Sequence, residues 1–297
     1  MELHQLRYVL AVVEHGTFTA AAAACYVAQP SLSHAVGLLE RELGVELFHR
    51  IGRRVVLTAA GEAFVEPARE ALRAIDTLRA EVASVAGAVT GRLDLVALPT
   101  LAVDPVAPLV GAFRRAHPGV SIRLAHPDDT AELARLVRSG ASEVGVTELP
   151  VVGERLVARP IGPQELVGLL PPGTPRPRRL ELSDLARRPV VTQAAGTSTR
   201  DVLDAALGAL GLEVALAVET DQREALVPLV LAGAGTAVVP APMAVVARRQ
   251  GAVVARLHPG LWRDLGLVHR EATLSPAARA FVELACAATP RPATRRS

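Results

Sequence analysis

The sequence predicts three parts in succession: an all-α winged helix-turn-helix domain over residues 1–58, a long helix over 59–90, and an α/β region of two lobes over 91–297. Three observations support this division. A helical pattern before Gly16, two further short helical patterns and then two short strand patterns occupy the first 58 residues. Apolar residues next recur every three or four positions up to about Val89, and strand and helix patterns alternate from Gly91 onward. Such alternation is typical of α/β folds.

Composition limits the class of protein before any motif is considered. Half of the 297 residues are apolar, enough to form separate cores in a small domain and a larger one. The 32 basic residues, all arginine, exceed the acidic residues by only two, so the overall charge does not by itself indicate nucleic-acid binding. The two cysteines exclude a disulfide-rich secreted scaffold, and no N-terminal signal segment is recognisable. We therefore expect a cytoplasmic protein.

Residues 17–58, which complete the first domain (the head), have the pattern of two short helices followed by a hairpin. Thr17 can cap the first helix, and Pro30 suits the first turn of the second, where its missing N–H costs nothing. Apolar residues of the second helix follow helical spacing and leave its polar residues facing outward until Gly44 ends it. Short strands at 47–48 and 55–57 enclose a basic turn, and a helix-turn-helix with a basic wing is typical of DNA binding. The candidate contacts to DNA are Gln29, Pro30, Ser31, Ser33, His34, Arg50, Arg53 and Arg54.

The linker helix predicted over 59–90 carries a regular apolar stripe. Its apolar residues alternate at spacings of four and three, the heptad pattern by which helices pair with one another. An amphipathic helix packed on its own domain would show a broader and less regular stripe. Pro67 lies inside the helix and should kink it or leave one carbonyl without a hydrogen bond. We therefore expect a homodimer or homotetramer that pairs through Phe64, Ala68, Ala71, Ile75, Leu78, Val82 and Val85.

From Gly91 onward the alternation of strand and helix occurs twice, which predicts a parallel sheet and two similar halves. Extended crossings near Arg159 and Asp264 divide the region into lobe I, about 91–160 and 266–289, and lobe II, about 161–265. One uncharged stretch, 226–247, is long enough to span a bilayer, but proline and glycine interrupt it five times. We read this stretch as a buried helix, a glycine turn and a buried strand, and expect no association with a membrane.

Ligands of open α/β sheets bind beyond the carboxyl ends of the strands, near the N-termini of helices. Residues 99–101 in lobe I and 196–199 in lobe II occupy such places. Their hydroxyls and free backbone N–H groups suit a small anion such as a carboxylate, although ordinary helix capping uses the same residue types. Asp128 and Asp129 lie beside the predicted cleft and would either repel an anion or favour a ligand that also carries an amine.

Several segments at fixed spacing match one known family: Leu6-Arg7-Tyr8, Gly16-Thr17-Phe18, Gln29-Pro30-Ser31-Leu32-Ser33, Glu42-Leu43-Gly44 and Gly61. On these residues the chain resembles the LysR-type transcriptional regulators. Ala28 departs from the pattern, because the family usually has serine or threonine there to cap the recognition helix. The resemblance continues over the rest of the chain, where it implies a dimerising linker helix and a two-lobe effector domain of the periplasmic-binding-protein type.

The resemblance also implies partners and a ligand site. The expected partners are double-stranded DNA containing an imperfect inverted repeat, a small-molecule effector, further copies of the chain, and RNA polymerase. Effector contacts in the family come from the loops at the strand ends. Carried over to this sequence, the effector-binding residues are Pro99, Thr100, Leu101, Pro127, Thr147, Thr197, Ser198 and Thr199.

Other classes of function find less support in the sequence. It shows no Ser-His-Asp spacing, P-loop, metal-spaced His/Cys cluster or dinucleotide glycine fingerprint, so we expect no enzyme, no cofactor and no metal. A disulfide switch within the effector domain is disfavoured because Cys286 is the only cysteine there. Two alternatives stay open: a two-lobe solute-binding protein, and a DNA-binding regulator whose cleft is vestigial.

Overall fold

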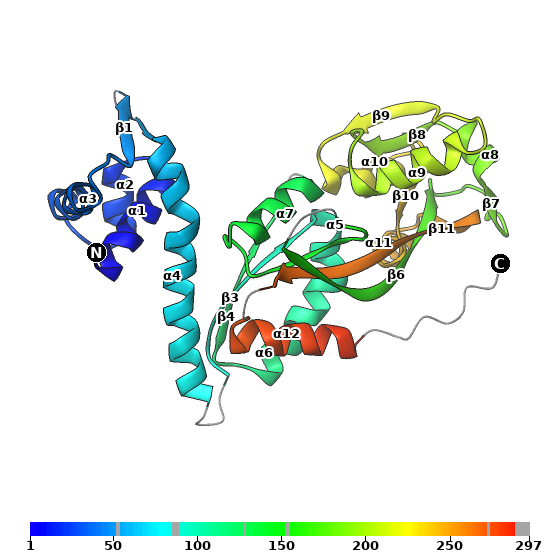
Figure 1. The fold of residues 1–297 in the computed structure, drawn as a ribbon. Helices are drawn as coiled ribbons and strands as arrows, with labels where there is room; N and C mark the ends of the chain where they lie inside the picture. The colour runs from blue at the N-terminus through cyan, green and yellow to red at the C-terminus, as the bar shows by residue number, and fades with distance from the viewer. Residues whose placement is uncertain (52–53, 85–88, 128, 152–154, 272–273, 289–297) are drawn as a thin grey trace.

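The computed structural model describes residues 1–51, 54–84, 89–127, 129–151, 155–271 and 274–288. Figure 1 shows a helical head, a long helix and a two-lobed α/β domain in that order along the chain. The predicted fold class, a helical winged domain followed by a linker helix and an α/β domain, is therefore confirmed.

The head is built from α1 (Leu3–His15), α2 (Phe18–Ala24), α3 (Gln29–Leu43) and the antiparallel strands β1 (Phe48–Ile51) and β2 (Arg54–Leu57). Thr17 caps α2, since its Oγ1 accepts a hydrogen bond from the backbone N–H of Ala20 at 3.1 Å. Gly44 ends α3 with a φ of 71°, a left-handed conformation that glycine adopts without strain. Helices and wing meet in one core, formed by Val9, Val12, Ala21, Ala22, Leu32, Val36, Leu39, Leu47 and Phe48.

The two strands of the wing extend closer to the turn between them than the strands predicted from the apolar residues at 47–48 and 55–57. They pair from Phe48↔Leu57 to Ile51↔Arg54, so β1 includes His49 and Arg50. Because the ladder of a hairpin is made by backbone groups, polar residues can continue it beyond the apolar positions that the sequence pattern detects.

The linker helix α4 (Ala59–Ser84) packs against the head at its first turn. A Cβ at Gly61 would overlap the carbonyl oxygen of Leu47, so the close approach of helix and wing requires glycine here. Pro67 is accommodated inside the helix. The helix was predicted to reach about Val89, but Val89 itself is not helical. Residues 85–88, which include Val85 of the predicted seam, lie outside the described residues.

The remaining seam residues fall into two groups along α4. Phe64 packs against the core of the head and Ala68 is buried, so both have apolar partners within their own chain. Leu78 and Val82 are instead 63% and 68% exposed, although they are large and apolar. Between the two groups, Ala71 is exposed and Ile75 is partly buried. Pairing with a second chain through the exposed group stays a prediction.

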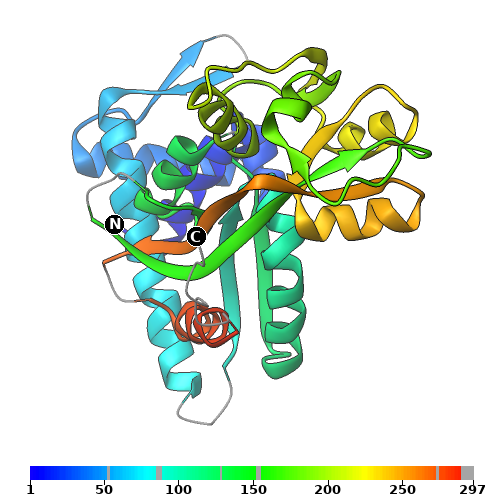
Figure 2. The ribbon, with the colours of Figure 1, turned by 90° about the vertical axis from the view of Figure 1, so that its right-hand side faces the viewer.

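The α/β domain has two lobes. Lobe I contains β3 (Gly91–Ala97), α5 (Pro99–Leu101), the π-helical turn η1 (Ala102–Val106), α6 (Ala107–Ala116), β4 (Val120–Ala125), α7 (Thr130–Arg138), β5 (Val144–Glu148) and the C-terminal α12 (Pro276–Ala287). Lobe II contains β7 (Leu180–Glu181), α8 (Leu182–Ala186), β8 (Val190–Gln193), α9 (Ser198–Gly208), β9 (Leu216–Thr220), the 3-10 turn η2 (Arg223–Ala225), α10 (Leu226–Leu231), β10 (Ala237–Pro240) and α11 (Ala241–Arg249). Two long strands, β6 (Leu156–Leu170) and β11 (Val253–Arg270), run through both lobes, as Figure 2 shows.

The main sheet has the order β10-β6-β11-β5-β3-β4, with β7 paired to β11. Strand β3 is parallel to β4 and β5, but β11 is antiparallel to β5 and β6, and β10 is antiparallel to β6. The prediction of a parallel sheet is therefore wrong where the lobes join. The reason is that β6 carries the chain from lobe I to lobe II and β11 carries it back, so the two run in opposite directions where they pair.

Each lobe has its own apolar interior. In lobe I, Leu93, Leu95 and Val96 of β3 pack against Phe113 of α6 and Phe281 of α12. In lobe II, two neighbouring clusters cover opposite sides of the sheet. The uncharged stretch 226–247 forms the expected helix and strand, α10 and β10, and then continues into most of α11, a helix that was not expected. No helix among the described residues is long and apolar enough to cross a membrane.

Candidate functional site

The first turns of α3 present polar groups to solvent. Gln29, Pro30, Ser31 and His34 are exposed and Ser33 is partly buried, while the buried residues of the same helix are Leu32, Ala35, Val36 and Leu39. Ala28 precedes the helix without a side-chain cap, and its carbonyl oxygen accepts a hydrogen bond from the N–H of Ser31 at 3.0 Å. Of the candidate wing residues, Arg50 and Arg54 lie on β1 and β2, and Arg53 lies outside the described residues.

Tyr26 belongs to this surface, although the sequence pattern did not single it out. It lies in the turn between α2 and α3, and its side chain is 96% exposed. Its φ of 56° is left-handed, a conformation that few residues other than glycine adopt. A lone aromatic residue next to an alanine-rich helix gives no sequence signal for such a conformation.

The second candidate site lies where the two lobes meet, around Arg263 of β11. The side chain of Arg263 is only 2% exposed. Its Nη2 donates a hydrogen bond to Thr100 Oγ1 of lobe I at 2.9 Å, and its Nη1 donates to Ser198 Oγ of lobe II at 2.7 Å. Nε and Nη2 also donate to Gln164 Oε1 of β6, at 2.9 and 2.6 Å. One arginine thus joins both lobes and the crossing strands.

None of the hydrogen-bond partners of the positively charged Arg263 is a carboxylate. All three partners are neutral side chains. Glu148 is one step away, because Ser198 donates a hydrogen bond to its Oε2. Burial lowers the pKa of Arg263 to about 10, against the opposing effect of Glu148, and burial likewise raises the pKa of Glu148. The centre of the cleft is therefore a buried cation whose compensation is indirect.

A small cavity of about 20 Å³ lies beside this arginine. Its walls include Thr100 from lobe I, Thr197, Ser198 and Thr199 at the N-terminus of α9, and Arg223. The Oγ1 of Thr199 and the Nε of Arg223 are buried and have no hydrogen-bond partner within the described part of the chain. Such groups favour a ligand that can accept and donate hydrogen bonds. The present volume holds about one water molecule, so a larger ligand requires the lobes to separate.

The structure brings together only half of the residues expected to bind an effector. Thr100, Thr197, Ser198 and Thr199 line the cavity. The other four expected residues, Pro99, Leu101, Pro127 and Thr147, are not among its lining residues, and Leu101 is fully buried in the core of lobe I. Asp129 also lines the cavity, and its carboxylate caps α7 by accepting a hydrogen bond from the N–H of Glu132 at 2.7 Å.

Sequence reasoning missed the residues at the centre of the cleft: Arg263, Gln164, Glu148 and Arg223. One signal could have found Arg263. Residues Leu261, Arg263 and Leu265 alternate with more exposed ones along β11, which places the arginine on the buried face of the strand. A charge at an inward position of a strand indicates a functional or paired group. No cluster of three or more metal-binding side chains occurs within the residues that the structure describes.

Both parts of the chain match models of known protein families. The model described as "Bacterial regulatory helix-turn-helix protein, lysR family" matches residues 3–62, and the model described as "LysR substrate binding domain" matches residues 86–289. Together with the fold, these matches define a DNA-binding transcriptional regulator with an effector-binding domain. The chain belongs to the LysR family. The helix-turn-helix match also removes the alternative of a solute-binding protein.

Individual relatives cover nearly the whole chain. The "SDS degradation transcriptional activation protein" of a Pseudomonas species is 35% identical over 294 residues, 94% of each chain. The "Probable hydrogen peroxide-inducible genes activator" of Mycobacterium leprae is 32% identical over 275 residues, 90% of this chain and 88% of that protein. Among solved structures, full-length CbnR in complex with its target DNA is 26% identical, with a TM-score of 0.70 over 96% of this chain and 99% of that one. A full-length OxyR variant from Pseudomonas aeruginosa, also 26% identical, has a TM-score of 0.75 over 96% and 93%.

Proposed function

We propose that this regulator binds an imperfect inverted repeat as a dimer or tetramer and responds to a small anionic effector, such as a carboxylate, in the cleft between the lobes. The observation that carries the effector part is the buried Arg263, which hydrogen-bonds to both lobes but has no carboxylate in contact. An effector carboxylate would neutralise this cation and could also accept hydrogen bonds from the N-terminus of α9. Binding there changes how the lobes are held together.

On DNA, each dimer would place two copies of α3 in successive major grooves, which explains the expected inverted repeat. The exposed apolar residues Leu78 and Val82 of α4 supply the surface for pairing. We place the protein in the cytoplasm, where its DNA lies, and expect RNA polymerase to be a further partner at target promoters. A solved complex of the similar protein CbnR with DNA supports duplex DNA as the partner.

The effector proposal can be tested by the thermal stability of the full-length protein. A ligand that binds only the native state raises its apparent stability, by about 2.7 kcal/mol at a concentration 100 times its Kd. We expect one or more members of a panel of small monocarboxylates to raise the melting temperature, and the matched primary amides to leave it unchanged. If carboxylates and amides act alike, recognition does not depend on the cation.

A regulator with a vestigial cleft is the second candidate, because one observation favours it. The cavity of about 20 Å³ has room for about one water molecule, and Arg263 beside it already donates hydrogen bonds to three neutral side chains of its own chain. In that case no member of the carboxylate panel changes the melting temperature, while sequence-specific DNA binding persists.

Replacing Gln29 by alanine tests how α3 reads DNA. An exposed glutamine at the start of a recognition helix can form paired hydrogen bonds to an adenine edge. We expect Gln29→Ala to weaken binding to the selected operator by about 1–3 kcal/mol and to leave binding to random DNA unchanged. Fluorescence anisotropy with both duplexes measures this difference, and Gln250→Ala, an exposed glutamine in lobe II, is the control. Equal losses on both duplexes would show that Gln29 does not read bases.

Three similar proteins are named as activators of hydrogen peroxide-inducible genes, so the two thiols need a test. Cys25 is partly buried at the end of α2, and burial raises the pKa of its thiol, which lowers the reactive thiolate fraction. Cys286 is exposed, but it lies on α12 in another domain. We expect Cys25→Ser to bind operator DNA like the wild type, and mild peroxide to change neither protein. Release of the wild type alone by peroxide would contradict this.

A further inference from the structure

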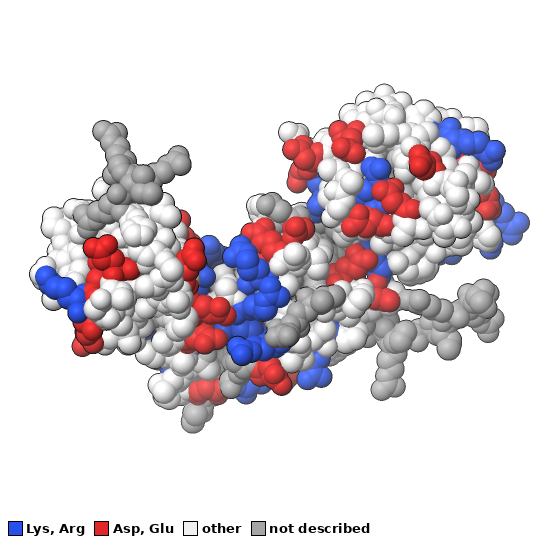
Figure 3. All heavy atoms as spheres, turned by 45° about the horizontal axis from the view of Figure 1, so that its top comes forward, with Lys and Arg blue, Asp and Glu red and all other residues white. Residues whose placement is uncertain are grey.

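A large groove lies outside the interlobe cleft, between the head, the linker helix and lobe I. It has a volume of about 820 Å³, and its walls come from α1, α4, the strands β3 and β4, and the start of α12. Figure 3 shows basic side chains gathered along this junction between the head and the effector domain. The volume is within the range of sites that bind small molecules.

Arginine predominates among the charged residues of the groove, with six arginines against four acids. Each acid already has its own partner. Three form ion pairs, and the fourth, Glu143, accepts hydrogen bonds from the backbone N–H and the hydroxyl of Ser275 at 2.6 and 2.9 Å. The three ion pairs are Glu14–Arg123 at 3.0 Å, Asp94–Arg92 at 2.6 Å and Asp76–Arg79 at 3.6 Å.

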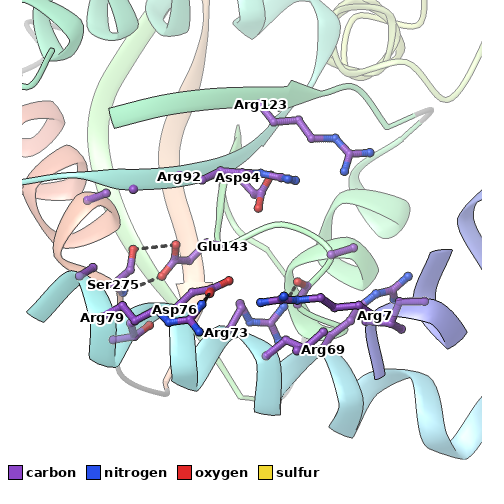
Figure 4. Close-up of a pocket in the computed structure, with 18 of the residues that line it drawn as sticks. Arg7, Arg69, Arg73, Asp76, Arg79, Arg92, Asp94, Arg123, Glu143 and Ser275 are labelled. Atoms are coloured by element: carbon purple, nitrogen blue, oxygen red, sulfur yellow. Dashed lines mark hydrogen bonds and ion pairs between the residues drawn. The ribbon is translucent and has the colours of Figure 1, made fainter. Parts of the chain in front are cut away.

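Three arginines are left without an acidic partner: Arg7 of α1 and Arg69 and Arg73 of α4. None of them forms an ion pair with any described residue. Figure 4 shows them side by side along one wall of the groove, with Arg123 across from them. Arg69 and Arg73 are four residues apart, so they lie on the same face of the helix.

Arg73 is the least satisfied of the three. Its Nη1 donates a hydrogen bond to the carbonyl oxygen of Gly140, but its Nε and Nη2 are buried and have no partner among the described atoms. Burial lowers its pKa to about 10, the nearby Arg270 acts in the same direction, and Glu143 and Glu70 act against it. Burial also lowers the pKa of Arg69, with Glu14 acting against that effect and Arg135 adding to it. An anion between these guanidinium groups would reduce their mutual repulsion and offset the cost of burying the charge of Arg73.

We propose that this groove is a second ligand site, which binds a small phosphate-bearing molecule through Arg7, Arg69 and Arg73. A phosphate group accepts hydrogen bonds from several guanidinium groups at once, which one carboxylate cannot do to the same extent. A ligand here would contact the head, the linker helix and lobe I together. It would reinforce the existing ion pairs Glu70–Arg270 at 2.9 Å and Glu81–Arg279 at 2.7 Å, which also join α4 to the effector domain.

Calorimetric titration of the full-length protein with inorganic pyrophosphate at low salt tests the proposal. We expect saturable binding of one pyrophosphate per chain, weakened about tenfold or more in Arg69→Gln/Arg73→Gln. Arg187→Gln, an exposed arginine of lobe II that is paired with Asp184, should bind like the wild type.

The proposal is overturned if the wild type shows no saturable binding, if the double variant binds as tightly as the wild type, or if Arg187→Gln loses as much affinity. Since Arg69 and Arg73 form no ion pair among the described residues, their loss should not unfold the protein, and circular dichroism checks this. If the double variant is misfolded, Arg7→Gln, at an exposed position of α1, is the deciding variant: an unchanged pyrophosphate affinity in it contradicts the site.

Discussion

Replacing Leu78 by aspartate is expected to dissociate the protein into monomers. Leu78 and Val82 are large apolar residues that are 63% and 68% exposed on α4. They lie on a different face of the helix from Arg69, Arg73, Asp76 and Ala80, which line the groove against lobe I. No part of the described chain covers them, so a second copy of the helix is the partner that their heptad spacing indicates.

The expected effect is large because the substitution occurs in both copies. Each buried leucine contributes about 1.5–3 kcal/mol, and an aspartate in its place must lose its hydration without a cation. We expect Leu78→Asp, and likewise Ile75→Asp, to raise the dimer dissociation constant about 1,000-fold or more. Sedimentation velocity measures the change. Val246→Asp, at an exposed valine of α11 in lobe II, is the matched control. An unchanged oligomer in Leu78→Asp and Ile75→Asp would place the interface elsewhere.

Replacing Arg263 by methionine is expected to destabilise the effector domain and to abolish its response to carboxylates. Methionine fills a similar volume but leaves Thr100, Gln164 and Ser198 without their donor between the lobes. Removing a buried charge is favourable by itself, yet the loss of one member of a buried polar network usually costs more, about 2–5 kcal/mol. For a domain of this size, that corresponds to a melting temperature lower by roughly 5–15 °C.

Arg256→Met is the matched control for this variant. Arg256 lies on the same strand, but its side chain is 80% exposed and its ion pair with Glu165 is 3.5 Å long. Calorimetry should therefore show little change for Arg256→Met, since exposed ion pairs contribute little. If Arg263→Met is as stable as the wild type, the arginine does not hold the lobes together. If the variant keeps a carboxylate-dependent shift, the effector is not bound through this cation.

The head could be predicted closely because its signals are local. Thr17, Pro30 and Gly44 mark helix ends through the conformations that these residue types prefer, and the structure has the helix boundaries at these positions. The sequence alone did not explain why residue 61 must be glycine. The requirement depends on the distance between α4 and the carbonyl of Leu47, which only the folded chain defines.

The cleft was predicted less completely because its central residues come together over long distances in the sequence. Thr100, Gln164, Ser198 and Arg263 meet only once β6 and β11 have crossed between the lobes. The alternation of strand and helix patterns predicted a parallel sheet and not these long antiparallel strands. The inward-facing Arg263 on β11 was therefore not predicted either. Hydroxyls at helix starts were found because capping and anion binding use the same residue types.

The central claim, that the protein is a dimeric reader of symmetric operator DNA, is tested most directly by selection from a random DNA pool followed by sequencing. Full-length protein is incubated with random duplexes at physiological salt, and the bound fraction is amplified and selected again. We predict enrichment of an imperfect inverted repeat, with its half-sites separated by about one helical turn or a multiple of one. Enrichment of a single asymmetric site, or of no sequence at all, would contradict the account.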